Sequence, residues 1–458
     1  MTAPSQAPAR AWLVPALALA AGLIAWLVLH QPDPERGFEI DEAEYLAMGL
    51  FSVEQLLGED DATRGGSIAL ALGVDPGTWR GGVHQVTFGF MSPGLPKLVF
   101  GSIVRAALPE DTPVSPLIFR RFAPEGMPDS QAKALRLGSR DALTPALEPA
   151  RAVTTGLAAL AAALLAAASA LVVRTFDRRP WTAALGAAAA TGLWLSAPAV
   201  QNAAHYVRPG LFPVVFWALA LVLFLVALAN RAPALARGEA TRPSPLLLVG
   251  LGLCLGLAAA GKLNGVLLAA VIPTLLWPLT TNKPRVLLWS AWVWGLGALV
   301  FYLMNPGLWS APIEGVDAIL AGWRGDMRWQ TEQYGGTLRV AESRIDALLL
   351  SVSALLREAG PLAGWVPYLG TTLCVLGMTA VGIGMRRSRA DHGLYWYAVL
   401  LLLGSALIVP MERMRYFLPM VGPLAICGGV LVARLAVGRG RPPSIEKSDS
   451  PTTGETGP

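Results

Sequence analysis

The chain has 458 residues, of which 54% are hydrophobic and 15% charged, and its formal net charge is +5. Soluble chains usually carry about a quarter of their residues as Asp, Glu, Lys or Arg, so this composition excludes an ordinary soluble protein. The positive charge does not indicate nucleic acid, because the basic residues lie in short clusters between apolar runs. That placement is typical of a membrane protein.

Ten apolar runs are long enough, at roughly 20 residues each, to cross a bilayer as helices. The first is too long for a signal peptide and no small-x-small cleavage site follows it, so it is expected to be an uncleaved anchor. We therefore predict an all-α polytopic integral membrane protein with about ten transmembrane helices. The runs lie at residues 11–30, 151–173, 181–200, 210–229, 245–261, 263–280, 286–304, 362–385, 393–411 and 416–436.

Basic residues mark one side of the membrane. The positive-inside rule places the connections that carry them in the cytoplasm. We expect a multi-pass protein of the plasma membrane, the inner membrane of a bacterium, with both termini cytoplasmic: residues 1–10 and a disordered tail at 437–458 that is rich in Pro, Ser and Thr. The connections concerned contain Arg10, Arg178, Arg231, Lys283, Arg386 and Arg439.

Two long connections lie on the opposite side, at residues 31–150 and 305–361, and they flank the helix groups 151–304 and 362–436. Loops of this length are usually functional. Within them, apolar residues repeat at helical spacing in three places. These repeats predict amphipathic helices that lie flat in the membrane interface, or that pack on one another as a small outer domain. The repeats begin at Leu46, Leu95 and Ile345.

Four carboxylates open the first outer loop: Glu39, Asp41, Glu42 and Glu44. A carboxylate at the bilayer surface is partly desolvated, which raises its pKa and suits it to take a proton from an acceptor hydroxyl or amine. Asp41 and Glu42 are therefore candidate catalytic residues. Asp41 with Glu44 three residues later also forms a capping-box pattern, which would only start a helix. The sequence leaves both interpretations open.

Basic and aromatic residues recur at the outer ends of the predicted spans, against the orientation bias. Ionisable residues at membrane depth are often functional, and the planar fork of Arg binds phosphate oxygens in pairs. Taken singly, each residue could equally contact a lipid headgroup or extend along apolar surface. As a group, they predict a cationic pocket for a lipid phosphate. The candidates are Lys97, His205, Tyr206, Arg208, Lys262, Arg413, Arg415 and Tyr416.

A metal site has little support in the sequence. Asp41, Glu42 or Asp75 could bind a divalent ion through oxygen, but no spacing requires it. We expect no required cofactor. The cysteines all fall within apolar spans, which predicts small core residues and no disulfide framework on the outer face. They are Cys254, Cys374 and Cys427.

The order of these motifs resembles the GT-C membrane glycosyltransferases, and most nearly the protein O-mannosyltransferase and lipid A aminoarabinose transferase group. The turn at residues 92–97 lacks the family's His and has Gly94 in place of its second Pro, and residues 59–87 match no part of the pattern. The matching stretches are Asp41-Glu42 with Tyr45, Ser92-Pro93-Gly94-Leu95-Pro96-Lys97, Arg208-Pro209, Lys262-Leu263-Asn264-Gly265 and Met414-Arg415-Tyr416-Phe417-Leu418-Pro419.

The resemblance implies a GT-C-like fold and transfer of a sugar, with inversion, from a polyprenyl-phosphate donor. The acceptor would be an extracytoplasmic protein, lipid or glycan. Asp41 would be the general base, with Glu42 its neighbour or alternate, and the cationic residues would hold the lipid phosphate and stabilise the charge that develops as it leaves. No nucleic acid partner is implied.

Three other functions are compatible with many spans and large outer loops. A transporter or flippase usually shows internal repeats and broken helices at mid-membrane, and we find no convincing repeat. A ligase or polymerase of lipid-linked glycans would depend on outer-loop arginines without the early carboxylate. A non-catalytic scaffold would use the outer loops to bind a protein partner.

Overall fold

The computed structural model describes residues 12–30, 42–56, 94–109, 129–239, 241–305, 339–409 and 414–438, together with Val114 and some residues between positions 308 and 332. In these ranges the regular structure is helical, which confirms the predicted all-α class. The α-helices are α2 (Leu13–Leu29), α3 (Glu42–Leu56), α6 (Gly94–Ala107), α7 (Asp129–Phe176), α8 (Pro180–Leu195), α9 (Pro198–Ala204), α10 (Leu211–Ala236), α11 (Pro245–Gly261), α12 (Leu268–Leu276), α13 (Arg285–Leu303), α15 (Arg344–Ala354), α16 (Leu369–Gly384), α17 (Arg389–Ala406) and α18 (Met414–Gly438). Short 3-10 helices flank α12 at Leu263–Leu267 and Trp277–Leu279, and a π-helix follows α15 at Leu355–Ala359.

Eight of the ten predicted spans each contain or overlap one of these α-helices, the span 181–200 covers the two helices α8 and α9, and the span 263–280 covers α12 with its flanking 3-10 helices. Four helices are long and apolar enough to cross a membrane, in α7, α10, α13 and α18. The pair α8 and α9, bent by 71°, makes a fifth if it counts as one span. Four shorter apolar helices occupy the remaining predicted spans, apart from α17, which meets neither test. The chain is polytopic, and the count of about ten stays a prediction.

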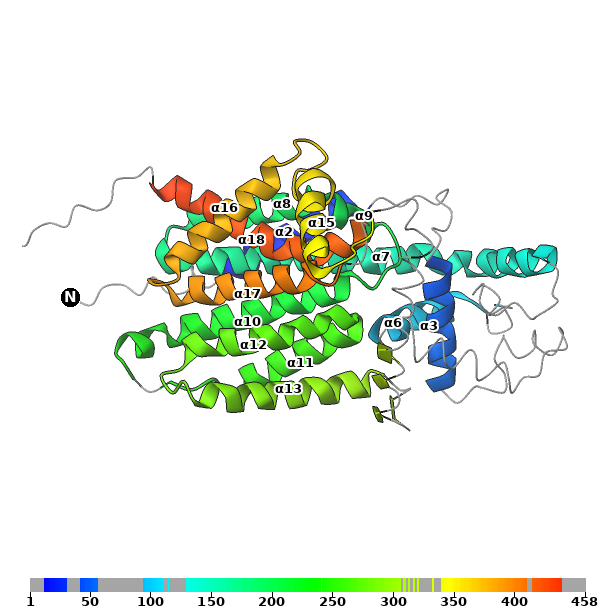
Figure 1. Ribbon diagram of the computed structural model, residues 1–458, viewed down its shortest axis with the longest axis horizontal. Helices are drawn as coiled ribbons and strands as arrows, with labels where there is room; N and C mark the ends of the chain where they lie inside the picture. The colour runs from blue at the N-terminus through cyan, green and yellow to red at the C-terminus, as the bar shows by residue number, and fades with distance from the viewer. Residues whose placement is uncertain are drawn as a thin grey trace, which may run out of the picture.

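The apolar helices run side by side in one bundle, and α3 and α6 lie together at one end of it (Figure 1). Helix α7 joins the two parts: its 48 residues extend from Asp129 in the outer part to Phe176 in the bundle. At 1.5 Å per residue it is about 70 Å long, well over a bilayer's thickness. Residues 129–150, which the sequence places in the first outer loop, are therefore the first part of a helix that continues into the membrane.

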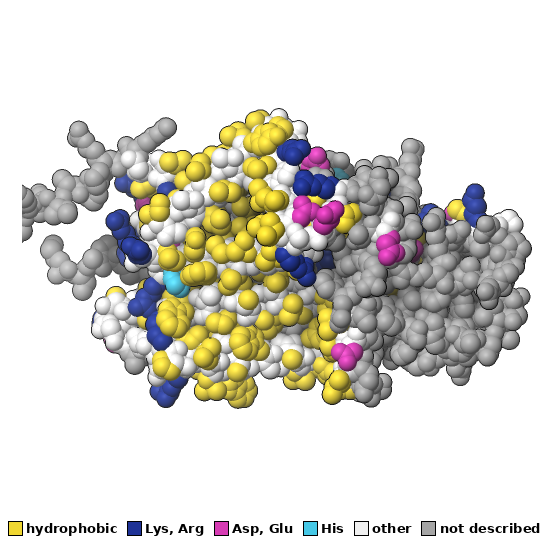
Figure 2. Space-filling view, in the orientation of Figure 1, with side chains coloured by type: hydrophobic (Ala, Val, Ile, Leu, Met, Phe, Trp, Pro, Cys, Tyr) yellow, Lys and Arg dark blue, Asp and Glu magenta, His cyan; other side chains and the backbone are white. Residues whose placement is uncertain are grey.

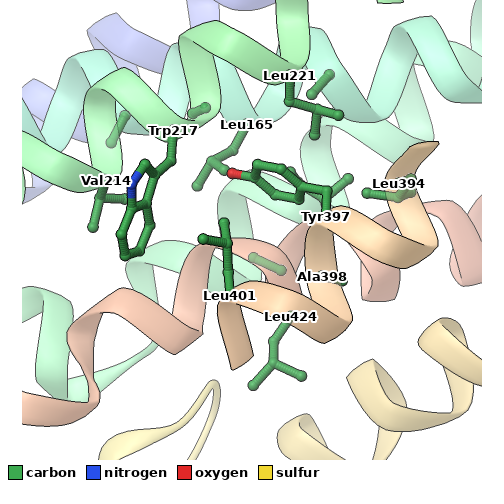
Figure 3. Packing of buried hydrophobic residues seen from close by; sticks show 14 of the residues in the cluster. Leu165, Val214, Trp217, Leu221, Leu394, Tyr397, Ala398, Leu401 and Leu424 are labelled. Carbon is green, nitrogen blue, oxygen red and sulfur yellow. The ribbon is translucent and has the colours of Figure 1, made fainter. Parts of the chain in front are cut away.

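Hydrophobic side chains cover the middle of the bundle in this view (Figure 2). Lys and Arg without neighbouring acidic side chains gather at the end opposite α3, whereas those at the other edge of the apolar band lie among Asp and Glu. Inside, large apolar side chains from α10, α17 and α18 meet (Figure 3). Trp217 and Tyr397 are 1% exposed and Leu401 is fully buried. The indole N–H of Trp217 donates to the Gly265 carbonyl oxygen at 3.2 Å, so the polar atom of this buried ring is satisfied. The three cysteines are free and buried, as predicted.

Helices α3 and α6 cross at two glycines. A Cβ on Gly101 would lie 2.0 Å from the Gly49 carbonyl oxygen, so only glycine allows this close approach. Around the crossing, Leu46, Leu50 and Phe100 are fully buried in a cluster that includes residues of α7. For these two helices the structure favours the small outer domain over helices that lie flat in the membrane interface.

Helix α15 differs from α3 and α6 because one of its faces is exposed. Ile345, Leu349 and Val352 are 71%, 58% and 47% exposed, while Leu350 on the opposite face is fully buried. Ser343 caps the helix by accepting from the Asp346 N–H at 3.1 Å. An exposed apolar stripe at this spacing is what an interfacial helix presents to a membrane.

Candidate functional site

Three short segments at helix ends carry three of the predicted cationic residues, Lys262, Arg208 and Arg415. Lys262 lies where α11 ends: its backbone is extended (φ −165°), and the chain turns back into a 3-10 helix. A Cβ on Gly265 would lie 2.0 Å from the Ala258 carbonyl oxygen, so the turn needs glycine there. Arg208 lies in the connection between α9 and α10, and Arg415 in the first turn of α18.

The structure brings Lys262, Arg208 and Arg415 together. Burial, together with the positive charges of Arg415 and Arg208, lowers the pKa of Lys262 to about 8. Two of these cations lie near the ring of Tyr416: Lys262 Nζ is 5.7 Å and Arg415 Cζ is 5.3 Å from its centroid. We call these three basic residues the cation cluster. All three are half-buried, and repulsion between positive charges that lie this close is unfavourable, so an anion beside them would be stabilised.

The connection that carries Arg208 is fixed by several contacts. An Nη1–H of Arg208 donates to the Asn202 amide oxygen at 2.7 Å, and its Cζ lies 5.1 Å from the Tyr206 ring centroid. His205 follows the last residue of α9 and is partly buried. Two residues from Lys262, the amide oxygen of Asn264 is buried and accepts no hydrogen bond from the described part of the chain. It adds a polar group beside the cluster.

Glu42, the first residue of α3, is fully buried and paired. Arg151 of α7 donates to both of its carboxylate oxygens, at 3.0 Å to Oε1 and 2.7 Å to Oε2. The Val207 N–H also donates to Oε1, at 2.9 Å. Because Val207 precedes Arg208, one buried carboxylate links the start of α3 to the segment that carries a member of the cation cluster.

Arg151 is not among the site residues predicted from the sequence. It stands at the first position of an apolar run and was counted as the edge of a span. Two signals were available: an arginine on the outer side opposes the orientation bias, and Glu148 lies three residues before it, at helical pairing distance. The Arg151 Nη1–H does donate to Glu148 Oε1, at 3.0 Å.

Lys97 lies in the first turn of α6, where it is 4% exposed, and burial lowers its pKa to about 7. The N-terminus of this helix is fixed against the end of α13. The Gly94 N–H donates to the Asn305 amide oxygen at 2.7 Å, and a Cβ on Gly94 would lie 1.7 Å from the Met304 carbonyl oxygen. This contact gives a physical reason why Gly94 replaces the second proline of the motif that the turn resembles.

Two of the predicted site residues, Asp41 and Arg413, lie outside the described residues, as do Asp75 and the segment 59–87. Their roles stay predictions. Among the residues that the structure describes, no group of three or more His, Cys, Asp or Glu side chains could hold a metal ion.

Comparisons with known proteins give matches in structure only. No protein-family model matches the sequence, and no curated protein is detectably similar. ArnT from Cupriavidus metallidurans in the apo state is 17% identical, with a TM-score of 0.47, over 94% of this chain and 62% of that one. The same protein bound to undecaprenyl phosphate gives 17% identity and a TM-score of 0.43, over 93% of this chain and 60% of that one.

A second solved protein also matches. The Archaeoglobus fulgidus oligosaccharyltransferase, tethered to an acceptor peptide, is 12% identical with a TM-score of 0.44, over 93% of this chain and 50% of that one. Both proteins are GT-C membrane glycosyltransferases. This chain spans about three fifths or less of their length. At these identities and TM-scores the likeness is distant, so the activity of this chain has to be argued from its own residues.

Proposed function

We propose that this protein is a membrane glycosyltransferase that moves a sugar from a polyprenyl-phosphate donor to an acceptor on the outer side of the membrane. One observation carries the proposal: Arg208, Lys262 and Arg415 come from three separate segments and meet, partly buried, at one end of an apolar bundle. A lipid phosphate has its charge at the membrane surface and its hydrocarbon chain in the bilayer. It therefore fits a cationic site at the end of an apolar helix bundle.

The reaction needs one proton acceptor and one charge acceptor. The acceptor oxygen or nitrogen forms a bond to the anomeric carbon while the bond from that carbon to the phosphate oxygen breaks, with inversion. The electron pair of the broken bond stays on the phosphate, where the cation cluster stabilises the added charge. The proton goes to a carboxylate. We assign this role to Asp41, because both oxygens of the neighbouring Glu42 already accept from Arg151 and the Val207 N–H.

Orientation is part of the proposal. Lys and Arg side chains without neighbouring acidic side chains gather at the end of the bundle opposite α3 (Figure 2). By the positive-inside rule that end is cytoplasmic, which places the cation cluster and the start of α3 outside. Both termini would then be cytoplasmic, and the membrane would be the plasma membrane.

Cells that lack the gene, rescued with either wild type or Asp41→Asn, provide the test. Mass spectrometry of the cell-envelope glycans should show one glycan modification lost on deletion, restored by wild type and still absent with Asp41→Asn, although the variant inserts in the membrane normally. Restoration by Asp41→Asn would remove the proposed base. Loss of function on changing Arg208 or Arg415 but not Asp41 would favour a ligase of lipid-linked glycans.

A further inference from the structure

We infer that Arg151 is a positioning residue for sugar transfer: through Glu42 it fixes the start of α3, one peptide from Asp41, relative to the cation cluster. The inference rests on the proposed function and names a residue on α7 that the motifs do not include. Its basis is a hydrogen-bonded group that we call the Glu42 node: the buried side chains of Glu42 and Arg151, the buried backbone N–H of Val207 and the half-buried side chain of Glu148.

Arg151 and Glu42 form a bidentate ion pair. Two nitrogens of Arg151 donate to the two oxygens of Glu42, so the guanidinium and carboxylate planes are aligned as well as close. The side chains of Arg151 and Glu42 are 7% and 0% exposed. A buried carboxylate that loses its cation is strongly unfavourable, so α3 is fixed here more firmly than surface contacts would allow.

The node joins three elements at one point. Glu42 belongs to α3, Arg151 to α7, and Val207 to the connection that carries Arg208. Helix α7 continues into the bundle. The start of α3, which follows Asp41 in the sequence, is therefore fixed relative to the bundle. A displacement of about 1 Å between reacting groups can lower a rate by 10²-fold. The start of α3 must therefore be held in place relative to the cation cluster for efficient transfer.

The segment that carries Arg208 is also held by contacts that do not involve Arg151. A change at Arg151 should therefore affect turnover without affecting lipid-phosphate binding. The hydroxyls of Thr154 and Thr155 both donate to the Ala204 carbonyl oxygen, at 3.2 and 3.0 Å, and Asn202 accepts from Arg208. Loss of Arg151 removes two hydrogen bonds to Glu42 and leaves the one from the Val207 N–H, so the start of α3 is held less firmly while Arg208 keeps its own contacts. Turnover should fall, and binding of the lipid phosphate should remain.

The experiment compares Arg151→Met with two other variants in the purified, reconstituted protein. Transfer is measured from a panel of undecaprenyl-phosphate-linked sugars, and binding is measured with undecaprenyl phosphate alone. For Arg151→Met we expect turnover per folded molecule to fall by about 30- to 100-fold, with a Kd within about 3-fold of wild type. Asn202→Ala should do the reverse, weakening binding by about 5- to 10-fold, the worth of one charge-assisted hydrogen bond. Arg140→Met, a change of the same type on the same helix, should match wild type in both.

Arg151→Lys should recover part of the lost turnover, because it keeps the charge and loses the fork. Unchanged turnover in Arg151→Met, or a loss that appears wholly in the Kd, would overturn the inference. If Arg151→Met does not accumulate, Arg151→Lys carries the test, and wild-type turnover in that variant overturns it.

A thermal unfolding cycle separates failure of this inference from failure of the proposed function. If wild type transfers no sugar from the panel, the proposed function fails, and the unfolding midpoints still test the node. Arg151→Met should lower Tm more than Arg140→Met does, and adding Glu42→Gln should restore part of the loss, since the unpaired charge is then removed. No such recovery would mean that the pair does not act as a unit.

Discussion

At the scale of single residues, two lysines lie in apolar surroundings that disfavour a positive charge. Lys97 is buried, and burial lowers its pKa to about 7. Lys262 is half-buried, and desolvation together with the charges of Arg415 and Arg208 lowers its pKa to about 8. A buried amine with a lowered pKa is stabilised in its charged form by any anion that comes to lie beside it. The charge state of Lys262 should therefore report on phosphate binding directly.

The first prediction concerns pH. Below pH 8 Lys262 is charged and adds to the attraction of the cation cluster for a phosphate; as pH rises through 8 it loses its proton and that attraction. The Kd for undecaprenyl phosphate should therefore rise by about 10-fold between pH 7 and pH 9, as expected for loss of one charge-assisted contact. Titration of the phosphate itself contributes little between pH 7 and pH 9, because its second pKa is about 6.

Lys262→Arg is the matched control, since arginine stays charged throughout. In this variant the rise above pH 8 should disappear, and any step near pH 7 that remains belongs to Lys97. A Kd that climbs equally in both proteins would show that Lys262 does not contact the phosphate.

Prediction from sequence at this scale rested on sidedness. Arg208, Lys262 and Arg415 are far apart in the chain, but each follows or precedes a predicted span on the same side, so helix topology suggests that they meet. The structure places them near one another, and their role in phosphate binding stays a prediction. Arg151 could not be found in the same way, because its partner Glu42 is 109 residues away. A pair of that separation depends on how α3 packs, and the hydrophobic pattern does not fix this.

At the scale of helices, the small outer domain depends on the crossing of α3 and α6. Gly101→Ala should destabilise the protein, because its new Cβ would lie 2.0 Å from the backbone of Gly49 and the helices must separate. Such overpacking typically costs about 1–3 kcal/mol. The measurement is the unfolding midpoint together with transfer activity, which should fall as α3 moves.

Gly138→Ala on α7 is the matched control. A Cβ at this position meets nothing within 4 Å, so the substitution should be neutral or stabilising, by at most about 1 kcal/mol, because alanine is the better helix former. Equal midpoints for the two variants would mean that α3 and α6 do not cross as described.

Element boundaries were predictable where hydropathy changes sharply and not where it changes gradually. The ten apolar runs are all helical, although the run at 181–200 is broken into α8 and α9, and α7 begins at Asp129, more than twenty residues before the apolar run at 151–173. Its polar first part contains Pro145 and Pro149 and has no apolar periodicity strong enough to announce a helix. Burial of Leu143 and Leu147 against α3 and α6 stabilises it instead, and that is tertiary information.

At the scale of the whole molecule, the proposed function requires that the cation cluster face the outside of the cell. Cysteine placed at Glu358, exposed beside α15, should react with a membrane-impermeant maleimide in intact cells. Cysteine at Glu239, exposed after α10, should react only after permeabilisation. The native cysteines are buried and give a low background. Labelling of position 239 in intact cells, with position 358 protected, would place the cation cluster in the cytoplasm and contradict the proposed outer acceptor.

The cation cluster is proposed to bind a phosphorylated polyprenyl lipid, and the direct test is to measure binding of undecaprenyl phosphate to purified wild type and to Arg415→Ala. Removing one charged contact from the cluster should weaken binding by about 10- to 100-fold at fixed pH and salt. Arg140→Met should bind like wild type. Equal affinity in wild type and Arg415→Ala, or no saturable binding by wild type, would contradict the account.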